Sequence, residues 1–294
     1  MSTTLLIDGP NLTMRAIHAG LHGPMSASGT NTAALTIFVN SLGKLIREES
    51  PSYIGIAWDS PEKGYRYSLH EGYKANRAES PIQDVKDSTF ALVREFCHLL
   101  GMCSTEVPTM EADDVIANWW HSAPQGPLLI ASSDHDFLQL AGPNPQGIET
   151  VVLRFGNGGI ESRWGGEAVS RLYHSPEHYP LIAVLAGDTS DNIPGIRGIG
   201  PKKAVKLLEK HEWDLESVLD EFPADRESVR AYFGMINLRD VSLSHLAMPT
   251  PVRVDEELTP RLRSFLERYE LRGALGKFQA GTFWRGVPYR RPSQ

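Results

Sequence analysis

Apolar and polar residues follow two different periods along the first 180 residues. Short apolar runs of the kind seen in buried strands alternate with longer stretches in which apolar residues recur every three to four positions. The short runs cover Thr3–Asp8, Tyr53–Trp58 and Leu128–Ser133, and the longer stretches cover Thr32–Glu49, Ile82–Leu100 and Glu111–Trp120. This alternation predicts an α/β fold with a mostly parallel central sheet and helices on both faces.

The pattern changes near residue 180, where strand signals nearly vanish and helical stretches punctuated by Gly and Pro take over. A chain of 294 residues suits one large domain or two ordinary ones. We therefore expect an α/β core over residues 1–180 and a helical C-terminal region over residues 181–294.

One stretch fits neither period. Ser60–Ser80 interleaves three tyrosines with basic side chains and shows little apolar periodicity. A connection of this length between a strand and a helix is usually functional or disordered. Basic and aromatic residues in alternation suit phosphates and stacked bases, and a solvated surface excursion is the alternative interpretation.

Carboxylates recur where predicted strands end and in short turns. Each alone can be a cap or turn residue, and Asp134 in particular can cap the helix that follows it. Side chains from separate strand ends can nevertheless converge, because ligands of open α/β sheets bind beyond the carboxyl ends of the strands. Asp188 and Asp191 would share one face if their segment formed a helical turn. The full set is Asp8, Asp59, Glu111, Asp113, Asp114, Asp134, Asp136, Asp188 and Asp191.

Converging carboxylates repel one another unless cations bind between them. Ligation by oxygen alone favours Mg²⁺ or Mn²⁺ over zinc, and two such ions about 4 Å apart form the usual clamp for phosphodiester hydrolysis. The net charge of −7 by itself argues against a nucleic-acid partner. Metal ions bound at this site would weaken that argument, because they would neutralise the carboxylates. Discounting the nine negative charges leaves the rest of the chain at +2.

A glycine-rich turn precedes a basic helix. Three glycines alternate with isoleucines that can anchor a hairpin, and Pro201 stands where a helix would start. The glycines would expose backbone N–H groups, and a helix N-terminus attracts phosphate. The residues predicted to bind DNA here are Gly195, Gly198, Gly200, Lys202, Lys203 and Lys206. A plain helix–loop–helix with solvated lysines is the alternative.

The remaining composition is that of an ordinary soluble protein. Cys97 and Cys103 lie in apolar surroundings and are expected to be small buried hydrophobes, not a disulfide or a zinc site. No apolar run is long enough to span a bilayer, and the first residues lack a signal-peptide pattern. We expect a cytoplasmic protein with no membrane association.

With these motifs in place, the chain resembles the 5′–3′ exonuclease/flap endonuclease family, especially the nuclease domain of bacterial DNA polymerase I and the stand-alone phage-type enzymes. The resemblance extends to about residue 240. The motifs that carry it occur in the family's order: DGPNLTMRAIHA, WDSPEKGYRYSLHEGYKANR, EADD, SSDHDFLQL and GDTSDNIPGIRGIGPKKA. It implies a PIN-like nuclease core and ligation of two Mg²⁺ ions by the nine carboxylates, with Mn²⁺ as a substitute.

The resemblance also assigns the two unusual segments. Residues at about 60–90 would form a helical arch through which a single 5′ strand passes, and residues at about 185–211 a helix–three-turn–helix element that grips duplex DNA and often binds K⁺ in this family. Lys74 and Arg15 would act on the scissile phosphate, with Tyr73 and Arg77 in the same catalytic set, and Arg66 would be a DNA-binding residue of the arch.

The implied function is hydrolysis of DNA at 5′ flaps, nicks and free 5′ ends in replication, repair or primer removal, with RNA–DNA hybrids as further substrates. The chain would act as a monomer, alone or with a separate DNA polymerase, in the cytoplasm or the host's cytoplasm if phage-encoded. Two alternatives are a PIN-like ribonuclease, which usually lacks the glycine hairpin and the arch, and a non-catalytic DNA-binding protein. The latter would have lost carboxylates from the metal site, and none of the nine is lost.

Overall fold

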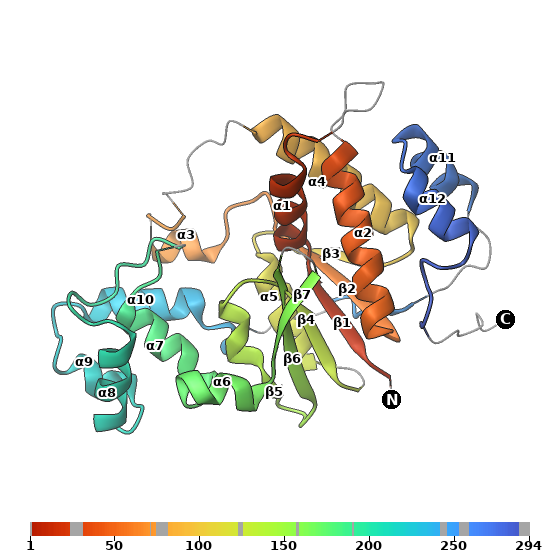
Figure 1. Ribbon diagram of the computed structural model, residues 1–294. Coiled ribbons are helices and arrows are strands. Elements are labelled where there is room, and N and C mark those ends of the chain that lie inside the picture. The colour runs from red at the N-terminus through yellow and green to blue at the C-terminus, as the bar shows by residue number, and fades with distance from the viewer. Residues whose placement is uncertain are drawn as a thin grey trace.

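The structure is a computed structural model that describes residues 2–23, 32–70, 72–74, 82–122, 126–156, 159–189, 191–241, 246–252 and 259–287. Arg77, with the rest of the predicted arch between residues 75 and 81, lies outside the described residues. A central sheet flanked by helices makes up most of the molecule, and a smaller helical region lies to one side of it (Figure 1).

Five parallel strands form the middle of the sheet. In spatial order they are β3 (Cys103–Glu106), β2 (Tyr53–Trp58), β1 (Thr4–Asp8), β4 (Leu128–Ala131) and β6 (Glu149–Gly156). Ile7 of β1 pairs with Ile56 of β2 and with Ala131 of β4, so these three strands end at one level. Buried parallel strands are nearly continuous apolar runs, which explains why β1, β2 and β4 were predicted from the sequence.

Three antiparallel strands complete the sheet: β5 (Gly142–Pro143) and β7 (Gly159–Trp164), which pair with β6, and β8 (Thr250–Pro251), which pairs with β2. These strands, and β3 and β6, were not among the predicted elements. In β3, Cys103 and Thr105 are buried while Ser104 and Glu106 are exposed, so this short edge strand has no continuous apolar run.

Helices cover both faces of the sheet, as predicted. One face carries α1 (Gly9–Gly20), α2 (Thr32–Glu49) and α4 (Gln83–Leu99), and the other carries α5 (Ala112–Ser122), the short helix η1 (Asp136–Leu140) and α6 (Gly166–Tyr173). Leu5 and Ile7 of β1 pack on the first face and Leu6 on the second, as the alternation of side chains along a strand requires.

A third apolar cluster forms the helical region, which consists of η2 (Pro176–His178), α7 (Tyr179–Ala186), α8 (Pro201–Lys210), α9 (Leu215–Leu219) and α10 (Arg226–Ile236), followed by η3 (Leu238–Asp240). Tyr67, from the short helix α3 (Tyr65–Leu69), and Tyr73 also pack in this cluster. The apolar side chains at the base of the predicted arch therefore pack against the helical region, whereas Arg66 of the same short helix bonds to Asp114 on α5.

The last two helices do not join the helical region. Phe265 and Leu266 of α11 (Pro260–Arg268) and Ala274 of α12 (Arg272–Gln279) lie in the same apolar cluster as α2 and α4, and Figure 1 shows both helices outside α2, on the far side of the sheet from α8. Residues 181–294 are thus not a single packing unit. The boundary near residue 180 stays a prediction.

Two smaller expectations concern the whole chain. Cys97 and Cys103 are buried free thiols, as predicted. Within the described ranges, every helix is too short or too polar to cross a bilayer.

Candidate active site

Several acidic residues lie together at one edge of the sheet. Asp8 is the last residue of β1, Asp59 follows β2, and Asp134 and Asp136 follow β4. Because β1, β2 and β4 end at the same level, these side chains come from neighbouring strand ends. Together with two residues at the start of α5 they form what we call the acidic cluster: Asp8, Asp59, Glu111, Asp113, Asp134 and Asp136.

Asp8 is held by two hydrogen bonds. Its Oδ1 accepts from the Asn11 N–H at 2.9 Å, which caps α1, and its Oδ2 accepts from the Ser132 hydroxyl at 2.6 Å. The pKa of Asp8 is raised to about 7, chiefly by burial and to a smaller extent by the charges of Asp59 and Asp134, despite these two bonds. Carboxylates from three strand ends are therefore within electrostatic reach of one another.

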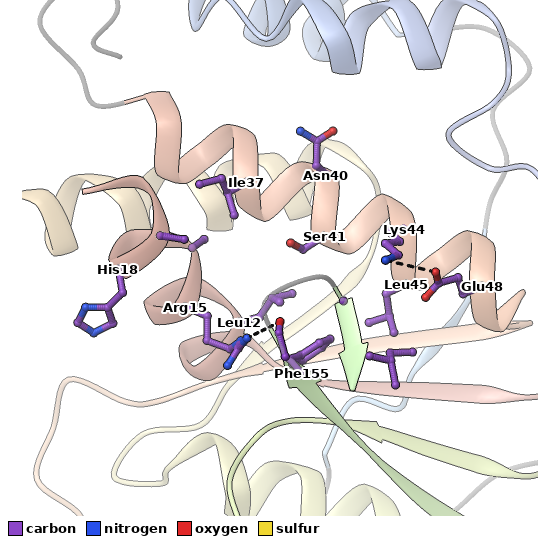
Figure 2. A pocket seen from close by; sticks show the side chains of 15 residues that line it. Leu12, Arg15, His18, Ile37, Asn40, Ser41, Lys44, Leu45, Glu48 and Phe155 are labelled. Carbon is purple, nitrogen blue, oxygen red and sulfur yellow. Dashed lines mark hydrogen bonds and ion pairs between the residues drawn. The ribbon is translucent and has the colours of Figure 1, made fainter. Parts of the chain in front are cut away.

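Arg15 lies on α1, two turns from Asp8, in a pocket of about 530 Å³ between α1, α2 and the end of β6 (Figure 2). Its Nη2 donates to the Gly156 carbonyl at 2.8 Å, and its guanidinium lies 5.8 Å from the centre of the Phe155 ring. Lys44 lines the same pocket and pairs with Glu48 at 3.6 Å. Arg15 is therefore held at the strand-end side of α1, and its predicted contact with the scissile phosphate stays a prediction.

Asp136 is the most unfavourably placed carboxylate of the acidic cluster. It is buried, and its Oδ1 has no hydrogen-bond partner among the described residues. Burial and the nearby charges of Asp134, Asp191 and Asp188 raise its pKa well above the ordinary value. A buried carboxylate oxygen without a donor costs free energy, so this position calls for a positive partner.

Asp134 is exposed and has a local structural role as well. Its Oδ1 accepts from the Asp136 N–H at 3.0 Å, so one of its oxygens stabilises the turn that follows β4. The capping interpretation thus accounts for one oxygen of Asp134. It does not account for Asp136. Its Oδ1 has no hydrogen-bond partner among the described residues, and no side chain caps η1 there.

Glu111 is held by residues from the predicted arch. Its Oε2 accepts from the Tyr73 hydroxyl at 2.8 Å, and its Oε1 from the Lys74 ammonium at 2.7 Å. Burial opposes ionisation of Glu111, but the cations of Lys74 and Arg66 outweigh burial and lower its pKa. Tyr73 was predicted to be catalytic. Its side chain is 2% exposed, so it supports Glu111 and offers no surface to a substrate.

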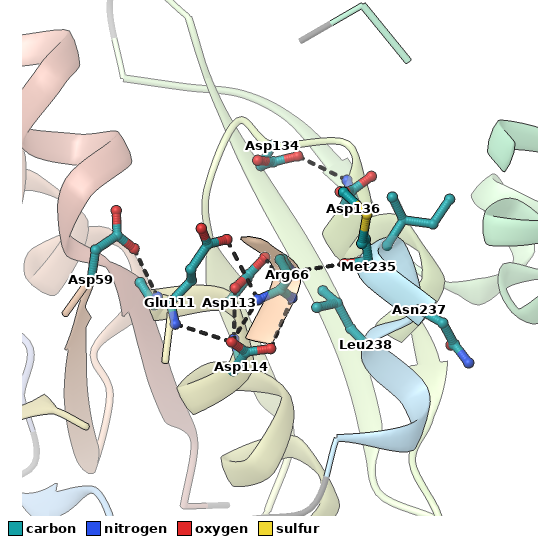
Figure 3. A network of polar contacts seen from close by, with 12 residues as sticks. Asp59, Arg66, Glu111, Asp113, Asp114, Asp134, Asp136, Met235, Asn237 and Leu238 are labelled. Carbon is teal, nitrogen blue, oxygen red and sulfur yellow. Dashed lines mark hydrogen bonds and ion pairs between the residues drawn. The ribbon is translucent and has the colours of Figure 1, made fainter. Parts of the chain in front are cut away.

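Arg66 requires a correction. It was predicted to contact DNA, but its side chain is buried and donates from Nη1 and Nη2 to the two oxygens of Asp114, at 2.6 and 2.8 Å (Figure 3). Asp114, predicted as a metal ligand, is fully buried, and both its oxygens are used by Arg66. Arg66 has no surface for a phosphate, and both Asp114 oxygens already accept hydrogen bonds from Arg66, so neither predicted role fits this geometry.

Whether the acidic cluster suits divalent cations can be judged from its own chemistry. In the described part of the chain, no three His, Cys, Asp or Glu side chains stand close enough to form a ready-made metal site. Each acid other than Asp136 accepts a hydrogen bond from the protein instead, as Asp59 does from the Ala112 N–H at 2.8 Å. The orphaned Asp136 Oδ1, the raised pKa of Asp8 and the all-oxygen donor set nevertheless fit hard cations.

Asp188 and Asp191 do not lie on a helical turn, which was the condition for their sharing a face. Helix α7 ends at Ala186, and the Asp188 backbone forms two hydrogen bonds with Ile193, at 2.8 and 2.7 Å. Gly187 ends the helix with a φ of 91°, which is why the chain leaves the helical path before Asp188. Both acids still contribute to the raised pKa of Asp136, so they lie near the acidic cluster.

The glycine hairpin, residues 192–200, has the predicted anchors. Ile193 and Ile196 are buried in the apolar cluster of the helical region, and Ile199 packs against it. Gly195 has a φ of 66°, and a Cβ there would lie 2.4 Å from the Gly187 backbone nitrogen, so this glycine is needed for the fold. A Cβ on Gly198 or Gly200 would meet nothing within 4 Å.

Helix α8 begins as predicted, with Pro201 in its first turn and Gly200 as the N-cap, and no side chain caps it. Lys202, Lys203 and Lys206 are exposed. Lys203 donates to the Gly198 carbonyl at 2.8 Å, so it braces the hairpin. The exposed glycine backbone and the two remaining lysines are available to a ligand on this side of the helical region.

A second cavity, of about 260 Å³, joins the arch to the acidic cluster. Asp59 and Glu111 line one part of it, and Lys63, Tyr67 and Lys74 line another. Carboxylates and ammonium groups therefore border one space that is large enough for a phosphate group.

Three residues that hold the site together, Ser132, Asn11 and Asn192, were not predicted from the sequence. The Ser132 hydroxyl and the Asn11 N–H both donate to the Asp8 carboxylate. The Asn11 side chain also accepts, through Oδ1, from the Ser133 N–H at 3.1 Å. Asn192 donates to the Gly72 carbonyl at 2.8 Å and ties the hairpin to the arch. The polar residues directly after a buried strand were a usable signal for Ser132, whereas no local pattern marks the contact of Asn192.

The fold agrees with comparisons to known proteins. The profile of the 5′-3′ exonuclease N-terminal resolvase-like domain matches residues 3–165, and that of the 5′-3′ exonuclease C-terminal SAM fold matches residues 174–257. This chain belongs to the 5′–3′ exonuclease family.

Curated relatives include thermostable DNA polymerase I of Thermus aquaticus, 34% identical over 93% of this chain, and DNA polymerase I of Mycobacterium tuberculosis, 31% identical over 85%. The chain spans 33% and 28% of their lengths, about a third. Among solved structures, the phage T5 D15 protein matches with a TM-score of 0.65, 15% identity and coverage of 95% of this chain and 98% of that one. Flap endonuclease-1 of Methanococcus jannaschii matches with a TM-score of 0.60, 14% identity and coverage of 95% and 92%.

Proposed function

We propose that this chain is a metal-dependent, structure-specific 5′ nuclease that hydrolyses phosphodiester bonds at 5′ flaps and free 5′ ends of DNA. The observation that carries the proposal is the meeting of carboxylates from separate strand ends beside a cavity that Lys74 also lines. Family membership supports it. So do two relatives of the same fold, the T5 D15 flap endonuclease in complex with DNA and metal ions and the catalytic core of Rad2 in complex with DNA substrate.

The residues that would hold divalent cations are the acidic cluster with Asp188 and Asp191. Carboxylates alone as donors suit Mg²⁺, with Mn²⁺ as a substitute. When bound, such ions make a water nucleophilic near neutral pH and stabilise the leaving oxygen. Asp114 is left out of this set because Arg66 takes both its oxygens.

The cations of the protein itself would act on the phosphate. Lys74 lines the same cavity as Asp59 and Glu111, and once free of Glu111 its ammonium can reach a phosphate there and stabilise the charge that develops on it. Arg15, in the neighbouring pocket, would hold the same strand at a second point. Arg77 belongs to this proposal through the family resemblance alone.

The glycine hairpin and the start of α8 would grip duplex DNA. The backbone of Gly198 and Gly200 is unobstructed, and the helix N-terminus attracts phosphate. Lys202 and Lys206 add positive charge beside it. A K⁺ ion bound at the hairpin is a further part of the proposal.

The proposed substrates are DNA with a 5′ flap, a nick or a free 5′ end, and RNA–DNA hybrids. The chain would act as a monomer in the cytoplasm, with a separate DNA polymerase as its functional partner, in replication, repair or primer removal. The polymerase activity of the longer relatives is no part of the proposal, because the chain spans only about a third of their length.

A cleavage assay tests the proposal directly. A 5′ flap, a nicked duplex, an RNA–DNA hybrid and a single-stranded RNA, each labelled at the 5′ end, are incubated with Mg²⁺, Mn²⁺ or EDTA. We expect cleavage near the flap junction with either ion and none in EDTA. Binding of the flap without cleavage under every condition would contradict the proposal, and preferential cleavage of single-stranded RNA would favour a PIN-like ribonuclease.

A further inference from the structure

Arg66 is the only lysine or arginine that is buried among the described residues. It comes from α3, at the base of the arch, and reaches two other parts of the chain. Its Nε donates to the Met235 carbonyl near the end of α10 at 2.7 Å, while Nη1 and Nη2 hold Asp114 on α5. A fully used guanidinium of this kind is fixed in position on all sides.

The contacts continue from Arg66 to two residues of the acidic cluster. Asp114 Oδ2 also accepts from the Glu111 N–H at 3.0 Å, so the atom that Arg66 holds fixes the Glu111 backbone. Asp113 Oδ1 accepts from the Asp114 N–H at 2.8 Å. Through the Asp114 carboxylate, Arg66 thus fixes the backbone of Glu111, which directly precedes the first turn of α5, where Asp113 lies (Figure 3).

Direct contacts from Arg66 to the same two acids are much looser. Nη1 lies 3.5 Å from Glu111 Oε2, and Nη2 lies 3.5 Å from Asp113 Oδ2. Contacts of this length yield easily to a stronger partner, whereas the pair with Asp114 does not. The guanidinium therefore attracts the two carboxylates into place without using up their oxygens.

We propose that Arg66 is a positioning residue that sets Glu111 and Asp113 for divalent-cation binding and does not contact DNA. The inference rests on the proposed function, because it takes these two acids as metal ligands. Lysine cannot do the same, since it lacks the planar fork that spans both oxygens of Asp114 and the Met235 carbonyl. Partners that orient metal ligands commonly change metal affinity by ten- to a hundredfold when they are removed.

The test measures Mn²⁺ binding to the free protein by isothermal titration calorimetry, without DNA. Three variants are compared with the wild type: Arg66→Lys, Arg66→Met, and the double variant Arg66→Met with Asp114→Leu. Arg66→Met strands a buried Asp114 carboxylate and is expected to lose stability, whereas the double variant replaces the buried pair by apolar side chains and is expected to fold. Arg230→Met on α10, which breaks an exposed ion pair with Glu216 on α9, is the matched control.

We expect Mn²⁺ affinity to fall by about tenfold or more in the double variant and by a smaller factor in Arg66→Lys, with Arg230→Met unchanged. Single-turnover kcat on a 5′ flap should fall in the same order while the Kd for the flap in Ca²⁺ stays within about threefold. Wild-type Mn²⁺ affinity in a folded Arg66→Lys or double variant overturns the inference, as does a large loss of flap affinity with metal binding unchanged.

The two proposals can fail separately. If the wild-type protein cleaves no flap but the Arg66 variants lose Mn²⁺ affinity, the proposed function is wrong and the positioning role stands. If the wild type cleaves the flap and the folded variants bind Mn²⁺ normally, only the role of Arg66 is wrong.

Discussion

The acidic cluster and the glycine hairpin are both proposed to meet the same DNA, yet they are built in opposite ways. Asp8 and Asp136 are buried carboxylates with raised pKa values, and the pKa of Glu111 is lowered only because Lys74 and Arg66 counteract its burial. The hairpin exposes its ligand surface instead, with open space around Gly198 and Gly200. The acidic cluster is electrostatically unfavourable until a cation binds, whereas the hairpin can bind a ligand without such a change.

This difference separates the region proposed for catalysis from the region proposed for DNA binding. Burying like charges destabilises a fold unless something offsets the repulsion, so such an arrangement persists where a bound cation or a reaction requires it. Exposed lysines and open glycines carry no comparable penalty. Substitutions of the buried carboxylates of the acidic cluster should therefore lower the rate and raise stability, whereas substitutions in the hairpin should change binding and leave stability alone.

The largest effect is expected for Asp136→Asn. Losing one ligand of a bound ion should lower cleavage of a 5′ flap by at least about a thousandfold, since such an ion supplies several kcal/mol. The same change removes a buried carboxyl group whose Oδ1 has no partner among the described residues, so in EDTA the variant should be more stable than the wild type by about 1–3 kcal/mol. Urea denaturation in EDTA measures the change in stability, and single-turnover cleavage in Mg²⁺ measures the change in rate.

Asp134→Asn is the matched control for that pair of measurements. Asp134 is exposed, so its loss should lower cleavage without the gain in stability. Flap binding in Ca²⁺ should stay within about an order of magnitude for both variants. An Asp136→Asn protein that is less stable than the wild type in EDTA would mean that Asp136 has an unrecognised structural partner.

Lys74 comes next. In this structure it pairs with Glu111, and in the proposed reaction it moves to the phosphate. We expect Lys74→Ala to lower single-turnover kcat by at least about a hundredfold, the effect of one well-placed donor in a dry site, while the Kd for the flap changes little. Lys74→Arg should restore part of the rate, because charge survives but its placement does not.

Lys63→Ala is the matched control, because Lys63 lines the same cavity and lies over the Tyr67 ring, whereas the ammonium paired with Glu111 is that of Lys74. It should leave kcat nearly unchanged. If Lys74→Ala binds the flap tenfold more weakly and cleaves at the wild-type rate, Lys74 only steers the strand.

Strands β1, β2 and β4 could be predicted because they are continuous apolar runs. Strand β2 and helix α2 have the predicted bounds, Tyr53–Trp58 and Thr32–Glu49. Strand β3 was missed because only alternate residues are buried. The packing of α11 on the face of α2 was also beyond prediction, since an amphipathic helix shows that it buries a face but not which surface it buries it against.

The site likewise contains residues that could be placed from the sequence and residues that could not. Acids at strand ends could be placed near one another because the carboxyl ends of parallel strands share an edge, and the mutual effects on Asp8 and Asp136 agree with that expectation. Arg66 could not be placed, because its partners Asp114 and Met235 lie far along the chain. A basic residue among tyrosines looks the same whether it points toward a phosphate or into the core.

In the hairpin, Gly200→Val tests DNA binding separately from stability. A Cβ at Gly200 meets nothing within 4 Å, and its φ of −101° suits any residue, so the fold should tolerate valine. Phosphate must approach the backbone there, and we expect flap affinity in Ca²⁺ to fall by about tenfold with an unchanged melting temperature. Gly273→Val, equally open but on α12, is the control. Normal binding by Gly200→Val would place the duplex contact elsewhere.

The smallest effect is expected for Lys206→Ala. Lys206 is exposed on α8, and it is a cleaner probe than Lys203, which also holds the Gly198 carbonyl. If it neutralises one phosphate, the slope of log K against log salt should become shallower by about 0.9, with only a few-fold loss of affinity at moderate salt. Binding titrations at several NaCl concentrations measure the slope. Lys210→Ala, on the same helix but already paired with Glu221, should leave it unchanged. Equal slopes for the wild type and Lys206→Ala would show that duplex DNA does not reach the second turn of α8, which would confine the grip to the glycine backbone and the first turn.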